Sequence, residues 1–189
     1  MSGLDLDLGA YQVVVAVATF LAAIHAWTKL SPEFAGSWFG AGLVFGWSWA
    51  PRGAGPEAVL LPVLVVYEAA AVTKGLVETR DRVRGNHVVH VIMTGLLSAV
   101  LALPWEAAAR AAGWPRPRTP GRELWGVPAD ALGGVGLDTV ALWTILGGLF
   151  YGAFKVVDHS GLPRGLQVLV LFGGVPFLPR AVDALHGML

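Results

Sequence analysis

Six apolar stretches, each close to the length that crosses a lipid bilayer, constrain this 189-residue chain more than any other feature. A transmembrane helix needs about 20 predominantly apolar residues, because each residue adds about 1.5 Å of helix. Only 14% of the residues are charged, whereas soluble domains usually carry about 25%. The chain is therefore predicted to be an all-α polytopic membrane helix bundle, with residues 1–189 forming a single transmembrane domain. The stretches cover residues 9–28, 34–50, 57–75, 87–104, 135–157 and 165–183.

The second stretch, residues 34–50, is short and rich in Gly and Trp, so the expected number of spans ranges from five to seven around six. It contains two small-xxx-small patterns, Gly36-x-x-x-Gly40 and Gly42-x-x-x-Gly46. Such patterns let two helices approach closely. They favour packing inside the bundle, and a homodimer or a larger membrane complex through this helix is the alternative.

The connection between the fourth and fifth stretches, residues 105–134, is dense in Pro and Gly and is predicted to lie outside the membrane. Within it, residues 105–113 are expected to form a short surface helix that pairs Glu106 with Arg110 at i, i+4. Gly147-Gly148 and the segment 173–176, Gly-Gly-Val-Pro, are expected to bend or break the last two membrane helices.

Several functional classes are excluded by what the sequence lacks. The formal net charge is zero, so no overall positive field attracts nucleic acid. The absence of cysteine removes disulfides, thiolate catalysis and Cys-ligated metals. The chain also lacks HExxH, GxSxG and the paired aspartates of magnesium-dependent prenyl transfer. No metal site is predicted.

With six spans, the loops after the first, third and fifth spans face one side of the membrane, called side A here, and both termini face side B. Seven basic residues fall on side A and six on side B, and four of those six lie in the single long loop. The N-terminus carries Asp5 and Asp7 and no basic residue before the first apolar stretch. By the positive-inside rule, side A is predicted to be cytoplasmic in a multi-pass protein of the cell membrane.

Ionisable groups collect on side A. In the fourth stretch His87, His90, Thr94 and Ser98 follow the spacing i, i+3, i+7, i+11, which places them on one polar stripe. Glu68 is the deepest carboxyl group expected on this side, and an unpaired carboxylate there costs about 2–3 kcal/mol or more. An intramembrane ionisable residue is a candidate for function by default.

These groups predict a small membrane enzyme of the lyase or isomerase type that acts on a lipid or isoprenoid by proton transfer. Cyclisation, hydration and isomerisation each need a proton donor, a neighbouring base and an apolar cavity, but no metal or cofactor. The predicted catalytic residues are Glu68, His90, His87, Asp158 and Tyr151. The predicted contacts to the substrate, including a phosphate-bearing head group, are Arg80, Arg82, Arg84, Asn86 and Lys155.

Other interpretations of these residues stay open. Lys155 near a helix end can serve as a snorkelling anchor, and the three arginines can serve only as the positive-inside signal. His25 paired with His87 or His90 would meet the depth requirement for ligating haem b. A substrate-binding transporter subunit or an accessory subunit of a membrane complex would also explain the glycine-rich spans.

Overall fold

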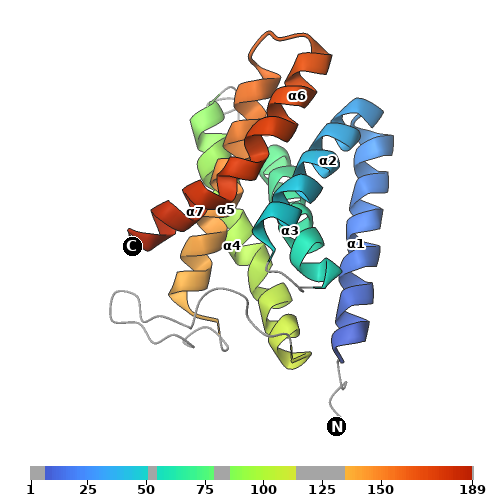
Figure 1. The fold of residues 1–189 in the computed structure, drawn as a ribbon, viewed down its shortest axis with the longest axis vertical. Coiled ribbons are helices and arrows are strands. Elements are labelled where there is room, and N and C mark those ends of the chain that lie inside the picture. The colour runs from blue at the N-terminus through green and yellow to red at the C-terminus, as the bar shows by residue number, and fades with distance from the viewer. Residues whose placement is uncertain (1–6, 51–54, 79–85, 114–134, 189) are drawn as a thin grey trace.

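The computed structural model describes residues 7–50, 55–78, 86–113 and 135–188, which fold into a bundle of helices (Figure 1). The helices are α1 (Leu8–Lys29), α2 (Pro32–Trp49), α3 (Pro56–Glu78), α4 (His87–Ala111), α5 (Leu137–Asp158), α6 (Arg164–Gly174) and α7 (Leu178–Gly187), with a short 3₁₀ helix, η1 (Val175–Phe177), between the last two. The prediction of an all-α bundle is confirmed, and the predicted spans match these helices to within a few residues, except at the end of α4.

Five segments of the described chain are long and apolar enough to cross a membrane. They are α1, most of α3, α4, α5 and the stretch Arg164–Gly187, which contains α6, η1 and α7. The chain is therefore a multi-pass helical membrane protein within the predicted range of five to seven spans. From α1 to α6, successive helices run in alternating directions (Figure 1). α1, α3 and α5 end at side A, where α2, α4 and α6 begin.

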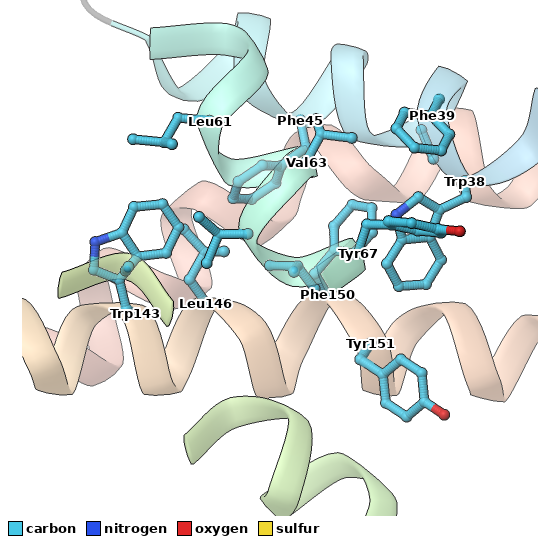
Figure 2. Packing of buried hydrophobic residues seen from close by; sticks show 14 of the residues in the cluster. Trp38, Phe39, Phe45, Leu61, Val63, Tyr67, Trp143, Leu146, Phe150 and Tyr151 are labelled. Carbon is cyan, nitrogen blue, oxygen red and sulfur yellow. The ribbon is translucent and has the colours of Figure 1, made fainter. Parts of the chain in front are cut away.

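The α2 helix is not among these five segments, yet it supplies the aromatic centre of the core. Trp38 is fully buried, and the centre of its ring lies 5.1 Å from that of Phe150 and 4.8 Å from that of Phe154 on α5. Figure 2 shows Trp38 and Phe45 of α2 near Tyr67 of α3 and Phe150. Large aromatic rings bury much apolar area, so they hold this short helix in the bundle.

Glycines of α2 let it cross α3 at close range. A β-carbon on Gly46 would collide with the backbone carbonyl of Val59, and one on Gly42 would lie 2.7 Å from the Val63 side chain. The Gly42-x-x-x-Gly46 pattern therefore packs inside the bundle, as predicted. Gly36 is exposed and has open space around its α-carbon. A homodimer through α2 stays a prediction.

The two glycine pairs of the last helices behave differently. α5 continues through Gly147-Gly148, so the helix does not break there. A β-carbon on Gly147 would collide with Ser98 of α4, and one on Gly95 of α4 would lie 2.7 Å from the carbonyl of Thr144. These glycines therefore serve close packing between α4 and α5. The expected break at Gly173-Gly174 is confirmed, because α6 ends there and η1 follows.

The α4 helix runs past Pro104 to Ala111, so residues 105–111 continue the membrane helix and do not form the separate surface helix that the sequence predicted. Contacts with other helices support this last part. Tyr11 of α1 donates its hydroxyl to the Trp105 carbonyl at 3.3 Å, and Trp143 of α5 donates its indole N–H to the Glu106 carboxylate at 2.9 Å. A proline inside a membrane helix is tolerated when neighbouring helices supply such bonds.

Candidate functional site

An apolar groove follows the contact between α4 and α5 on the surface of the bundle. It consists of an open cavity of about 600 Å³ along the middle of the α4–α5 contact and one of about 400 Å³ near side A. The two cavities share Val91, Ile92 and Gly152 in their walls, so they form one continuous hollow, which we call the α4–α5 groove. Its far end is lined by Leu178 and Leu185 of α7.

Small residues create this groove. Gly95 of α4 and Gly148 and Gly152 of α5 line it and place only backbone where other residues would place a side chain. The nearest neighbours of a β-carbon on Gly152 would be the methyl groups of Val91, at 3.6 and 3.7 Å. The same close approach of α4 and α5 that depends on glycine thus leaves a shallow channel beside the helix contact.

Basic and imidazole side chains stand at the side-A mouth of the groove. His87 at the start of α4, and Lys155 and His159 at the end of α5, all line the cavity nearest side A. The rings of His87 and His159 lie 4.6 Å apart between centres. The mouth of an otherwise apolar groove therefore carries three groups that can hold positive charge.

The orientation of the His159 ring follows from its contacts. Its Nδ1 atom lies 3.0 Å from the backbone carbonyl of Lys155. A carbonyl only accepts hydrogen bonds, so Nδ1 carries the proton and the lone pair of the neutral ring is on Nε2. The Asp158 carboxylate, 3.7 Å from Nδ1, would stabilise the ring once it is protonated. An imidazole oriented in this way can accept a proton.

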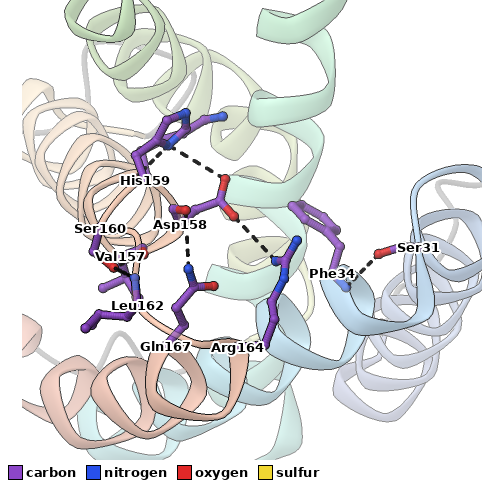
Figure 3. A network of polar contacts seen from close by, with 10 residues as sticks. Ser31, Phe34, Val157, Asp158, His159, Ser160, Leu162, Arg164 and Gln167 are labelled. Carbon is purple, nitrogen blue, oxygen red and sulfur yellow. Dashed lines mark hydrogen bonds and ion pairs between the residues drawn. The ribbon is translucent and has the colours of Figure 1, made fainter.

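Asp158 also ties the end of α5 to the start of α6. Its carboxylate lies 3.7 Å from the Arg164 guanidinium, and its backbone carbonyl accepts a hydrogen bond from the Gln167 side chain at 3.4 Å (Figure 3). Ser160 closes the turn by donating its hydroxyl to the Val157 carbonyl at 2.7 Å. These contacts fix the short connection that presents Asp158 and His159.

The structure brings several predicted site residues together and keeps others apart. His87, Lys155 and Asp158 gather at the end of α5, as their common side predicted. His90 lies one turn below His87, with 6.5 Å between the ring centres, and is buried. Tyr151 is also buried, and its ring centre lies 5.7 Å from the Lys155 ammonium.

Glu68 has different neighbours. The side chain of Trp105, near the side-B end of α4, is a hydrogen-bond partner of its half-buried carboxyl group. Thr73, more than one turn closer to side A on α3, already lies level with Thr94 of α4, because their hydroxyl groups are 3.1 Å apart. Glu68 therefore lies farther from side A than the sequence suggested, whereas Asp158 belongs to a separate group of contacts at side A. The catalytic role of Glu68 stays a prediction.

The polar stripe that begins with His87 and His90 continues into a helix contact. Thr94 and Ser98 are fully buried, and Ser98 donates its hydroxyl to the Thr94 carbonyl at 2.7 Å. Thr94 contacts Thr73 of α3, and Ser98 faces Gly147 of α5. The lower half of the stripe thus joins α4 to its two neighbours, and only His87 of the stripe's upper half lines the groove.

The predicted substrate-binding residues before α4 fall into two groups. Asn86 is the N-cap of α4, and its side-chain oxygen accepts the backbone N–H groups of Val88 and Val89 at 3.1 and 3.2 Å. This contact gives Asn86 a structural role, because capping satisfies donors that the helix leaves open. Arg80, Arg82 and Arg84 lie outside the described residues.

The histidines considered for haem b lie against different helices. The Nδ1 atom of His25 on α1 is 2.7 Å from the Tyr67 hydroxyl on α3, whereas His87 on α4 lies beside His159 on α5. Ligation of haem b by His25 with His87 or His90 stays a prediction.

Sequence reasoning missed a buried polar cluster near side B. Glu57 at the start of α3 and Tyr11 of α1 are each only 1% exposed, and the Glu57 and Glu106 carboxyl groups both lie near the Tyr11 hydroxyl. Asp138 is also buried, and its backbone carbonyl is 3.0 Å from Nε2 of His186. The available signal was the presence of charged residues at the ends of apolar stretches, which does not separate buried groups from exposed ones.

Comparisons with known proteins give no relative: no family model, curated protein or solved structure matches this chain.

Proposed function

We propose that this membrane protein binds an anionic lipid or isoprenoid in the α4–α5 groove and moves a proton on it at the side-A mouth. The observation that carries the proposal is the continuity of two apolar cavities that end at His87, Lys155 and His159. A long apolar channel with a basic end matches an amphiphile that has a hydrocarbon tail and an acidic head group.

The charges at the mouth favour an anionic head. Lys155 would attract a phosphate or carboxylate, and His87 would add a hydrogen-bond donor when it is protonated. In the sequence, Arg80, Arg82 and Arg84 precede His87 by only a few residues and would extend the same attraction.

The proposed chemistry is an acid–base isomerisation. Nε2 of His159 would take a proton from the bound lipid, and the resulting imidazolium would be stabilised by Asp158, 3.7 Å away. The proton on Nε2 would exchange with water, and Nε2 would then deliver a proton to another atom of the lipid, so the isomerisation needs no oxidant, metal or second substrate. His159 is the catalytic candidate in this scheme, and Asp158 is its positioning residue.

The test of binding uses protein purified in mild detergent, with the retained lipid identified by mass spectrometry. Wild-type protein should retain an anionic lipid. Gly152→Leu, which fills the groove beside Val91, should reduce the retained amount at least fivefold, because the added side chain occupies the channel. Gly75→Leu is the matched control, since Gly75 is exposed on α3 with open space around it. Equal retention by both variants would refute the groove.

The test of chemistry uses the lipid identified in this way, incubated with the protein in deuterated water. His159→Gln keeps a polar side chain of similar size but removes the base, so deuterium incorporation should fall at least a hundredfold while binding is kept. Lys155→Met should instead weaken binding. If His159→Gln incorporates deuterium at the wild-type rate, the proton-transfer scheme is wrong and the groove serves binding or transport alone.

A further inference from the structure

A second cavity lies on the opposite face of α5, between the start of α2, the end of α5 and the start of α6. It has a volume of about 350 Å³ and shares no lining residue with the α4–α5 groove. We propose that this cavity, called the α2–α6 pocket, binds the zwitterionic head group of an amine-bearing membrane phospholipid. The proposal does not rest on the function suggested for the groove, although Asp158 takes part in both.

The floor of the α2–α6 pocket is aromatic. Phe34 of α2, Phe154 of α5 and Phe172 of α6 line it, and the rings of Phe34 and Phe154 meet edge to face with 5.4 Å between their centres. Both rings also pack against buried Trp38, whose ring centre lies 5.8 Å from that of Phe34 and 4.8 Å from that of Phe154. Aromatic faces attract an ammonium group, and they do so more strongly where water is excluded.

The pocket carries both signs of charge. Glu33, in the first turn of α2, and Asp158, at the end of α5, supply carboxylates that would bind an ammonium group. Arg164, at the first residue of α6, supplies a guanidinium that would bind a phosphate. Arg164 and Asp158 are 3.7 Å apart, so opposite charges already stand side by side in the wall (Figure 3).

This arrangement differs from the mouth of the α4–α5 groove, whose ionisable lining groups are one lysine and two histidines. A head group with a phosphate and an ammonium matches the α2–α6 pocket in charge, whereas a purely anionic head would meet two carboxylates there. The apolar side chains Val168 and Leu171 of α6 continue the wall and would contact the first part of the acyl chains.

The position of Asp158 and His159 explains how one helix end serves two sites. These neighbouring residues lie on different faces of the last turn of α5, so Asp158 lines the α2–α6 pocket and His159 lines the groove. One turn earlier, Phe154 lines the α2–α6 pocket and Lys155 lines the groove. The end of α5 therefore separates a pocket of mixed charge from a basic mouth.

The experiment is native mass spectrometry of the delipidated protein titrated with phosphatidylethanolamine or phosphatidylglycerol, with Gly152→Leu in every sample so that no anionic lipid is bound in the α4–α5 groove. Protein with an unchanged α2–α6 pocket should bind phosphatidylethanolamine at least tenfold more tightly than phosphatidylglycerol. Glu33→Gln should abolish that preference, because Glu33 is exposed and its amide analogue keeps the shape but loses the charge. Asp183→Asn is the control, since Asp183 is an exposed carboxylate on α7 that is absent from the pocket wall.

Soluble phosphoethanolamine, added as a competitor, separates recognition of the head group from recognition of the whole lipid. Displacement of the lipid by millimolar phosphoethanolamine would show that the pocket recognises the head group alone. No displacement would show that the acyl chains are also required. Either result supports a site for this lipid class if the Glu33→Gln variant loses its preference. The proposal would be overturned if Glu33→Gln still preferred phosphatidylethanolamine, or if protein with an unchanged α2–α6 pocket bound the two lipids equally.

Discussion

The two ends of this bundle use the same kinds of side chain in opposite ways. Near side B, Glu57 and Tyr11 are buried among the helices, and the partly buried Glu106 accepts a hydrogen bond from Trp143. At side A, Asp158 and His159 are partly exposed and stand at the rims of cavities. Carboxylates near the ends of membrane helices can therefore hold a bundle together or face a ligand, and hydropathy does not distinguish the two.

The difference arises from packing. Toward side B, α2 and α3 cross so closely that Gly46 touches the Val59 backbone, and the end of α4 is bound to α1 and α5. Toward side A, Gly36 of α2 has open space around it and two cavities open beside α5. Side-B substitutions should thus change stability, and side-A substitutions should change ligand binding.

The largest expected effect comes from Gly46→Ala. The new methyl group would overlap the Val59 carbonyl, which belongs to the backbone and cannot turn away, so α2 and α3 must separate. A loss of about 3 kcal/mol in the free energy of unfolding is expected, from the cost of overpacking a core. Thermal unfolding in detergent would measure it. Gly36→Ala, on the same helix near side A, should change stability by less than about 0.5 kcal/mol, and equal losses would contradict the contrast between the ends.

A smaller effect is expected from Trp143→Phe. The substitution removes the indole N–H that donates to the Glu106 carboxylate at 2.9 Å, and a hydrogen bond to a charged group contributes about 1.5–3 kcal/mol. Denaturation by sodium dodecyl sulfate should show a loss of about 2 kcal/mol. Trp27→Phe provides the comparison, because Trp27 is 59% exposed on α1. A Trp143→Phe protein as stable as wild type would mean that the side-B cluster does not hold the helices together.

The smallest change in stability is expected from His159→Ala at side A. The ring is half exposed, and it bonds only to the end of its own helix and to neighbouring Asp158, so unfolding should shift by less than about 0.5 kcal/mol. Thermal unfolding, measured beside Trp143→Phe, would check this value. A loss above about 2 kcal/mol would make His159 a structural residue and would remove the contrast with the side-B cluster.

The sequence predicted the helices well because hydropathy and capping are local properties. Asn86 caps α4 where the apolar stretch begins, and the Gly173-Gly174 break lies where a glycine pair precedes Pro176. It failed where a distant partner decides the outcome. α4 passes Pro104 because Tyr11 and Trp143 contact the residues beyond it, from other helices.

The candidate site was predicted only in part, for the same reason. The common location of His87, Lys155 and Asp158 followed from the order of the spans. The depth of Glu68 depends on how far α3 slides along α4, which periodicity does not specify, and the structure sets it through the contact of Thr73 with Thr94. His159 was not predicted as a site residue, because its ring orientation depends on the Lys155 carbonyl.

The break between α6 and α7 has a consequence for the dimensions of the α4–α5 groove. Leu178 and Leu185 line the part of the groove farther from side A, so under the proposed function the tail length that the groove accepts would depend on where the chain leaves α6. Inserting one helical turn before η1 would move α7 by about 5.4 Å and leave His87, Lys155 and His159 in place. Tail length and head-group contacts would then vary independently.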